Sequence, residues 1–313
     1  MGLATDLYEL TMAQSYLEAR KTKPAVFSLF VRRLSENRSF LVSSGLETLL
    51  ERIERFKFNE EELTYLKHLG FSNDFLSYLR HYRFSGNIYA INEGRIIFEN
   101  EPLIQVEASL PDAQILETLV INTVHFQTLV ASKAARSYLA SRGKPLVDFG
   151  LRRAHGVEAG LYAARAAYIA GVGSTSNLMA GEMFDIPVTG TMAHSYVEVF
   201  DSEKEAFRSF ARSFPKNAVF LIDTYDVLEA SKKVAELFKE GTPAMAVRID
   251  SGDLADLSWK VRAILDEAKL QQVKIIVSGG LDEYDVKRLV DEAAPIDVFA
   301  VGTMLVTSAD RPY

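Results

Sequence analysis

The sequence predicts an α/β protein, an incomplete (β/α) barrel preceded by a smaller α+β domain. After residue 143, short apolar stretches recur, and most are followed by a segment with helical periodicity. This alternation is typical of parallel strands joined by crossover helices. Before residue 111, strand-like and helix-like stretches also occur, but they do not alternate regularly. We therefore expect two domains: an N-terminal α+β domain at residues 1–110, and an incomplete barrel at residues 111–313 that carries the active site.

The expected N-terminal domain begins with a helix at residues 5–20, for which Thr5 is a plausible N-cap. Residues 25–34 have the composition of a strand. An amphipathic helix and three short strands follow, at residues 44–56, 87–91, 95–98 and 103–107. These elements are mixed in order, as in an α+β domain.

A long helical pattern from Pro111 to Gly143 opens the second domain. Six apolar stretches then predict strands, at residues 145–150, 186–190, 218–223, 244–250, 274–280 and 297–302. Residues 171–176 could form a further short strand. No GxGxxG motif follows an early strand, so a barrel is better supported than an open dinucleotide-binding sheet.

Composition excludes several classes of site. The chain has 313 residues and no cysteine, which rules out disulfides, thiolate nucleophiles and cysteine-based zinc sites. With 42 acidic and 35 basic side chains, its formal charge is −7, which argues against a nucleic-acid partner. No signal peptide or membrane-spanning stretch is visible, so we expect a cytoplasmic protein without a membrane partner.

Polar side chains gather where the predicted strands end. In a barrel, the carboxyl ends of the strands form the active site. The residues at these ends include Asp148, Arg152, Arg153, Ser176, His194, Asp223, Arg248, Asp250, Asp253 and Ser278. Such a collection at equivalent positions predicts a binding site there.

Two glycine-containing turns indicate a phosphate site. Gly279–Gly280 and Gly302–Thr303 follow predicted strands and precede predicted helices, where backbone N–H groups can hold an anion. Glycines that simply form tight turns are the alternative. In "RIDSGD", Asp250 and Asp253 could hold ribose hydroxyls or a hydrated Mg²⁺ while Arg248 meets a phosphate; a surface ion-pair turn is the alternative.

Phe149 and His194 each allow more than one interpretation. Phe149 could stack on a flat ring or belong to the core. His194 could be structural, or it could accept a phosphoryl group as a nitrogen nucleophile. Metal ligation by His194 is disfavoured, because no second histidine stands three or four residues further on.

Seven segments of the sequence occur one after another in this order: "TDLYELTMAQ", "DFGLRRAHG", "GSTSN", "GTMAHSYV", "RIDSGD", "SGGLDE" and "VGTMLVTS". Together they resemble the signature segments of the nicotinate phosphoribosyltransferase family, over residues 5 to about 308. The resemblance implies transfer of 5-phosphoribosyl from phosphoribosyl pyrophosphate to nicotinate, giving nicotinate mononucleotide and pyrophosphate in NAD biosynthesis. It also implies ATP as co-substrate, Mg²⁺, and a homodimer with shared active sites.

The resemblance further implies roles for individual residues. Phe149 would stack on one face of the pyridine ring and Tyr8 of a second subunit would cover the other. Arg152 would reach the ring substituent or the pyrophosphate, and Ser176 would lie near the nicotinate carboxylate. The phosphoribosyl group would meet Arg248 and Asp250, and its phosphate would meet Gly279, Gly280, Gly302 and Thr303. His194 would be the histidine that ATP phosphorylates.

Three alternatives remain open at this point. One is a relative that uses nicotinamide, and another is a catalytically silent regulator of the NAD pathway. A sugar-phosphate aldolase or isomerase is disfavoured, because no lysine stands at a predicted strand end. Family chains normally continue past the segment at residues 302–313, adding strands and basic residues. We therefore expect this chain to be a truncated product or a short member.

Overall fold

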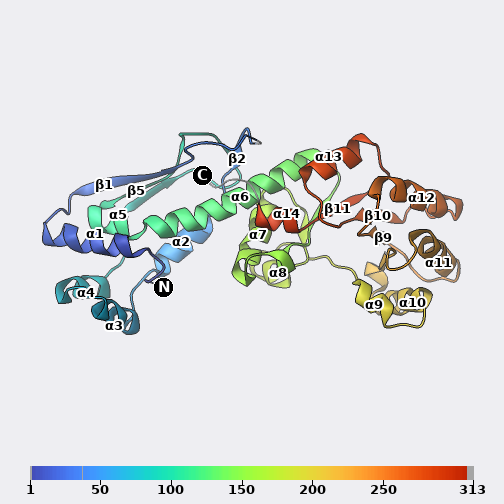
Figure 1. The fold of residues 1–313 in the computed structure, drawn as a ribbon, viewed down its shortest axis with the longest axis horizontal. Coiled ribbons are helices and arrows are strands. Elements are labelled where there is room, and N and C mark those ends of the chain that lie inside the picture. The colour runs from blue at the N-terminus through green and yellow to red at the C-terminus, as the bar shows by residue number, and fades with distance from the viewer. Residues whose placement is uncertain (1, 37, 309–313) are drawn as a thin grey trace. The chain divides into compact units, whose positions relative to one another are not determined.

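The computed structural model describes residues 2–36 and 38–308, shown as a ribbon in Figure 1. They form two compact units, one up to Ser132 and the other from Lys133 onward. The division falls within helix α6 (Glu117–Ser141), whereas the sequence placed it before Pro111. No helix in the described part of the chain combines the length and apolarity needed to span a membrane.

The first unit contains an antiparallel sheet of three strands in the order β1-β5-β3, formed by β1 (Pro24–Phe30), β3 (Asn87–Ala90) and β5 (Pro102–Ser109). A second pair joins β2 (Leu41–Val42) to β4 (Ile96–Ile97). The helices that accompany these strands are α1 (Leu7–Glu18), α2 (Leu46–Arg55), α3 (Glu60–His68), α4 (Asn73–Arg80) and α5 (Leu110–Ile115). An α+β arrangement was expected, and the structure confirms it.

Helices α3 and α4 were missed by the sequence analysis, although their N-caps are visible in the sequence. Asn59 accepts a hydrogen bond from Glu62 N, and Glu62 accepts one in return from Asn59 N, which completes a capping box. Ser72 caps α4 by accepting from Phe75 N. The long helix predicted at 111–143 is also divided, because α5 ends at Ile115 and α6 begins at Glu117.

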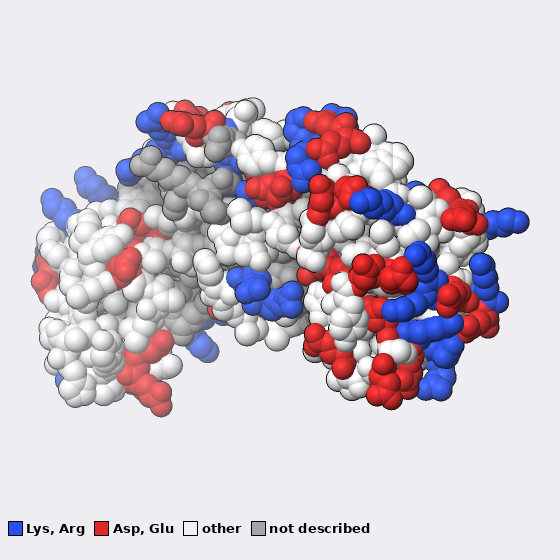
Figure 2. All heavy atoms as spheres, turned by 45° about the vertical axis from the view of Figure 1, so that its right-hand side comes forward, with Lys and Arg blue, Asp and Glu red and all other residues white. Residues whose placement is uncertain are grey.

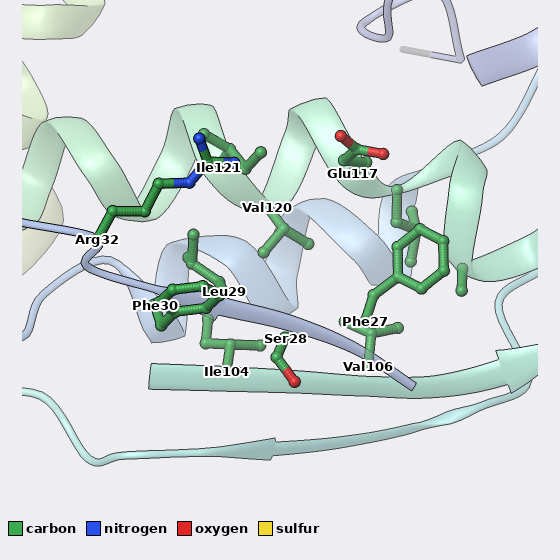
Figure 3. A pocket seen from close by; sticks show the side chains of 12 residues that line it. Phe27, Ser28, Leu29, Phe30, Arg32, Ile104, Val106, Glu117, Val120 and Ile121 are labelled. Carbon is green, nitrogen blue, oxygen red and sulfur yellow. The ribbon is translucent and has the colours of Figure 1, made fainter. Parts of the chain in front are cut away.

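A cavity of about 470 Å³ lies within the first unit. Figure 3 shows Phe27 and Val106 of the sheet and Val120 of α6 among its mainly apolar lining side chains. Only two of the residues that line it carry a charge, Arg32 and Glu117. The cavity therefore lacks the convergent polar groups expected of the predicted site.

The second unit is built on a parallel sheet of six strands in the order β7-β6-β11-β10-β9-β8. The strands are β6 (Leu146–Asp148), β7 (Ser174–Thr175), β8 (Val219–Leu221), β9 (Ala246–Ile249), β10 (Lys274–Val277) and β11 (Val298–Val301). This curled, open sheet confirms the predicted incomplete barrel.

Helices follow or connect these strands: α7 (Val157–Ile169), α8 (Leu178–Phe184), α9 (His194–Glu198), α10 (Glu203–Ser213), α11 (Val227–Lys239), α12 (Leu254–Glu267), α13 (Glu283–Asp291) and α14 (Thr303–Thr307). On the face shown in Figure 2, basic and acidic side chains are interspersed over the surface. This face therefore shows no broad patch of a single charge, and the charge at a binding site is set by the few residues that line the site.

The strand predicted at residues 186–190 is wrong. Only Val188 pairs there, in a single bridge with Thr175. The sixth strand is instead Ser174–Thr175, in the stretch that the sequence offered as a further short strand. Pro187 has no N–H to donate to a neighbouring strand, which is one reason why the pairing does not extend beyond this bridge.

Candidate active site

A cavity of about 950 Å³ lies at the carboxyl ends of the parallel strands of the second unit. Its lining comes from the segments that follow β6, β7, β9, β10 and β11, and from residues 190–193. Nine of the predicted site residues line it together: Phe149, Arg152, Ser176, Arg248, Asp250, Gly279, Gly280, Gly302 and Thr303. His194 and Tyr8 are not among the lining residues.

Asp148 fixes the turn that carries Phe149. Its carboxylate is buried and accepts hydrogen bonds from Gly150 N at 2.8 Å and from the Thr175 hydroxyl at 2.7 Å. Its main-chain oxygen accepts from Ser176 N, also at 2.8 Å. Burial raises the pKa of Asp148, and the two hydrogen bonds oppose that rise. Because protein donors already satisfy this acid, its function is to hold the ends of β6 and β7 in place.

Arg248, on β9, is the main buried cation of the cavity. Its side chain is only 11% exposed, and its Nη1 donates to the hydroxyl of Thr191. The guanidinium carbon lies 5.8 Å from the centre of the Phe149 ring, above one face. The buried Nε has no hydrogen-bond partner among the described residues. Burial lowers the pKa of Arg248, but a guanidinium remains charged at any physiological pH.

Asp223, after β8, supports the turn after β9. One of its oxygens, Oδ2, accepts from Asp250 N at 2.9 Å and from the Ser251 hydroxyl at 2.7 Å. The other oxygen, Oδ1, is buried and has no partner within the described chain. Asp250 in turn accepts from the Ser278 hydroxyl. The sequence placed Asp223 at a strand end but assigned it no role.

The turn after β10 requires glycine at one position and favours it at the next. Gly279 has φ +102°, and a Cβ there would lie 2.0 Å from the main-chain oxygen of Asp250. Gly280 has φ +79° and open space where a Cβ would stand. Neither N–H donates to the backbone of another described residue. These N–H groups are therefore available to an anion.

The two glycine turns differ in how they meet the following helix. The N-terminus of α13 is occupied by its own cap, because the Asp282 carboxylate accepts from Tyr284 N and Asp285 N. Gly302, in contrast, is itself the N-cap of α14 and offers no side chain. A helix follows each turn, as predicted: α13 begins at Glu283 and α14 begins at Thr303. An anion at this turn would meet the loop N–H groups.

His194 is not at a strand end, as the sequence suggested, but is the first residue of α9. It stands after the lining residues Thr191, Met192 and Ala193. Its Nδ1 lies 3.1 Å from the Thr224 hydroxyl, and its Nε2 lies 4.0 Å from Asp250 Oδ2. The ring is 40% exposed, so both a ligand and solvent can reach it.

Tyr8 belongs to the first unit. Its hydroxyl donates to Glu117 Oε1 at 2.9 Å, and the residue is 45% exposed. Burial of the hydroxyl and its bond to Glu117 raise the pKa of Tyr8 to about 12. The side chain is therefore neutral at physiological pH and presents part of its ring on the surface of this unit.

Within the described residues, no three acidic or histidine side chains are grouped to hold a metal ion. Mg²⁺ often binds differently, through one or two carboxylates and the phosphates of a substrate. The carboxylate of Asp250, which lines the cavity, fits that mode of binding.

Two family models match the chain. The N-terminal domain of nicotinate phosphoribosyltransferase (NAPRTase) matches residues 3–125, and the nicotinate phosphoribosyltransferase (NAPRTase) family matches residues 145–312. Both matched segments together extend over nearly all of the chain.

Curated relatives and a solved structure agree with the family models. Nicotinate phosphoribosyltransferase pncB2 of Mycobacterium tuberculosis is 49% identical over 99% of this chain and 68% of its own length. The Bacillus subtilis enzyme is 44% identical over 100% of this chain and 65% of its own length. The structure of human nicotinic acid phosphoribosyltransferase superposes with a TM-score of 0.88 at 30% identity, covering 95% of this chain and 72% of the human one. The chain belongs to the nicotinate phosphoribosyltransferase family.

Proposed function

We propose that this chain transfers the 5-phosphoribosyl group of phosphoribosyl pyrophosphate to the ring nitrogen of nicotinate. The products are nicotinate mononucleotide and pyrophosphate, and the reaction serves NAD biosynthesis. The observation that carries the proposal is the cavity at the strand ends, where Arg248, the glycine turns and Phe149 line one space in a member of this family.

The donor would be bound by the side of the cavity formed after β9, β10 and β11. The free N–H groups of Gly279 and Gly280, together with the Gly302–Thr303 turn, suit its 5-phosphate. Arg248 and Asp250 would meet the phosphoribosyl group. Asp250 and Asp223 would hold Mg²⁺ together with substrate phosphates, and the bound ion would offset the charge of the pyrophosphate.

Nicotinate would be bound on the side formed after β6 and β7. Arg248 lies above one face of Phe149, which leaves the opposite face for the pyridine ring. Ser176 and Arg152, both in the cavity lining, would meet the nicotinate carboxylate. Ser176 is a neutral donor, so it does not repel that carboxylate.

The reaction needs stabilisation of charge more than proton transfer. As the bond from ribose to pyrophosphate breaks, the sugar gains the character of an oxocarbenium ion and the leaving group gains negative charge. A preorganised guanidinium such as that of Arg248 stabilises the leaving group. The pyridine nitrogen of nicotinate is unprotonated at neutral pH, so no general base is required.

ATP coupling is a further part of the proposal. The γ-phosphoryl group of ATP would pass to a ring nitrogen of His194 with release of ADP, and water would later cleave the phosphohistidine. The exposed ring and its place beside Asp250 support this role. In a homodimer, Tyr8 of one subunit would cover the nicotinate in the site of the other.

The test is an assay of pyridine mononucleotide formation from phosphoribosyl pyrophosphate and Mg²⁺. Nicotinate, nicotinamide and quinolinate are compared, each with and without ATP, for the wild type and for His194→Ala. We expect product mainly from nicotinate, with ATP stimulation that His194→Ala abolishes. Faster reaction with nicotinamide, or binding of substrates without product, would contradict the proposal. Stimulation that survives in His194→Ala would contradict only the phosphohistidine.

A further inference from the structure

The cavity of the first unit, shown in Figure 3, has a buried floor and an open mouth. Ile104 and Val106 of β5 and Val120 of α6 form part of the floor, and each is at most 5% exposed. Phe30, at the end of β1, and Ile121 of α6 also line the cavity, yet they are 38% and 39% exposed. Two large apolar side chains therefore remain in contact with water beside an apolar space of about 470 Å³.

Arg32 gives this cavity a positive charge that no described residue compensates. Its side chain is exposed and lines the cavity, and Figure 3 shows it beside Phe30 and Ile121 at the mouth. No hydrogen bond or ion pair joins this side chain to another residue in the described part of the chain. The guanidinium is therefore free to bind an anionic group that enters the cavity.

Glu117, the other charged residue of the lining, already has hydrogen-bond donors. Its Oε1 accepts from the Tyr8 hydroxyl at 2.9 Å, and its Oε2 accepts from Gln114 Nε2 at 2.6 Å. Figure 3 shows Glu117 on the side of Phe27, whereas Arg32 lies on the opposite side. A ligand that enters at the mouth therefore meets one cation and an apolar wall.

We propose that this cavity binds a small amphipathic monocarboxylate, with its apolar chain on the buried floor and its carboxylate on Arg32. The volume lies within the range of small-molecule pockets, about 300–1,000 Å³. Burial of the chain removes apolar surface of the ligand and of the mouth from water, which is favourable in proportion to the area buried.

The charge of the lining selects the head group of the ligand. The planar guanidinium of Arg32 suits a carboxylate, because two parallel N–H groups match its two oxygens. A single cation offsets one negative charge, so a monocarboxylate is favoured over a phosphate ester. This site lies in the first unit, whereas the proposed active site lies in the second, and it does not rest on the proposed function.

The test is titration calorimetry of the whole chain with octanoate and, as a neutral probe of the same chain length, octanol. We expect octanoate to bind at one site, with a Kd about fivefold lower than that of octanol, the order of one exposed ion pair. Binding should lower the heat capacity, as burial of apolar surface does. A higher salt concentration should raise the Kd of octanoate relative to that of octanol.

Matched substitutions locate the ligand. Arg32→Ala should raise the Kd of octanoate about fivefold, to that of octanol. Arg33→Ala should leave it unchanged, because Arg33 is the neighbouring exposed cation and is not among the lining residues. Ile121→Glu places a negative charge at the mouth and should weaken octanoate binding more than Arg32→Ala does. All three side chains are exposed, so we expect these variants to fold, and their thermal midpoints check this.

Absence of saturable octanoate binding would overturn the proposal. So would an equal Kd in Arg32→Ala and the wild type, or a Kd that Ile121→Glu leaves unchanged, because the ligand would then lie elsewhere. Self-association that Ile121→Glu abolishes in analytical ultracentrifugation, without octanoate binding, would show that a second copy covers the cavity instead. Because the readout is binding in the first unit, failure of this proposal would leave the proposed function untouched, and the reverse also holds.

Discussion

Two clusters of charged residues in the second unit differ in how their members are paired. In the first, Glu283 of α13 meets two cations of α6, Lys133 at 2.8 Å and Arg136 at 2.7 Å. Lys133 and Glu283 are only 4% and 5% exposed. In the second, Arg248 lies 3.9 Å from Asp250, and Asp223 Oδ1 is buried without a partner in the described chain.

The difference separates a structural cluster from a binding one. Short contacts between Glu283 and its cations let the charges compensate each other away from water. The contact between Arg248 and Asp250 is 3.9 Å long, too long for a direct hydrogen bond, so these two charges remain available to a bound ligand. The presence of opposite charges alone, which both clusters share, would not have distinguished them.

The largest expected effect on stability comes from breaking the closely paired cluster. Glu283→Gln would leave Lys133 and Arg136 without their carboxylate, and we expect a loss of about 3–5 kcal/mol in the free energy of unfolding. Urea denaturation measures it. As a control, Lys260→Gln removes one partner of an exposed pair on α12, Lys260–Asp256, and should change stability by less than about 0.5 kcal/mol. Similar losses in both variants would contradict this account of the first cluster.

The turn beside the second cluster offers a matched pair of substitutions. Gly279→Ala and Gly280→Ala both place a side chain in the left-handed region, at a cost of about 1–2 kcal/mol each. Only Gly279→Ala also brings a Cβ against the main-chain oxygen of Asp250. We therefore expect it to destabilise the protein further and to raise the KM for phosphoribosyl pyrophosphate more. Equal KM values in the two variants would show that this turn does not determine the position of Asp250.

Glu9, in the first unit, shows a third arrangement: a buried acid with hydrogen-bond donors and no ion pair among the described residues. Its carboxylate accepts from Thr118 N at 2.7 Å and from the Thr5 hydroxyl. Burial, with smaller contributions from Glu117 and Asp6, raises the pKa of Glu9 from 4.5 to about 7.

A raised pKa in the folded state means that the protonated form stabilises the fold. That stability is fully present below pH 4.5 and is lost as the pH rises through about 7. We expect a loss of about 2–3 kcal/mol between these limits, and Glu9→Gln should remove this part of the pH dependence. The measurement is urea denaturation of both proteins at pH 5 and pH 8. An identical pH dependence in the two proteins would show that the ionisation of Glu9 does not cause the loss of stability.

The incomplete barrel and much of its site could be predicted from the sequence because their signals are local. Each strand end is an apolar run followed at once by polar residues or glycine, as in the stretches around Asp148, Arg248 and Gly279. The two-residue strand β7 gave only a weak signal. Residues 186–190 looked like a strand because they are apolar, but pairing depends on distant residues that the sequence pattern does not reveal.

The contacts that organise the site could not be predicted, because they join residues far apart in the chain. Thr191 and Arg248 are separated by 57 positions, and Asp223 and Asp250 by 27. Neither Thr191 nor the unpartnered oxygen of Asp223 has a sequence signature of its own. Their importance follows from burial and from the hydrogen bonds that they make or lack.

The central claim is that the loosely paired cluster of Arg248, Asp223 and Asp250 binds the phosphoribosyl donor. Titration calorimetry with phosphoribosyl pyrophosphate and Mg²⁺ tests it in the wild type, in Arg248→Lys and in the control Lys260→Gln. Lysine keeps the charge of Arg248 but loses its planar set of donors. We predict a Kd at least tenfold higher for Arg248→Lys and an unchanged Kd for Lys260→Gln. A wild-type Kd in folded Arg248→Lys would contradict the claim.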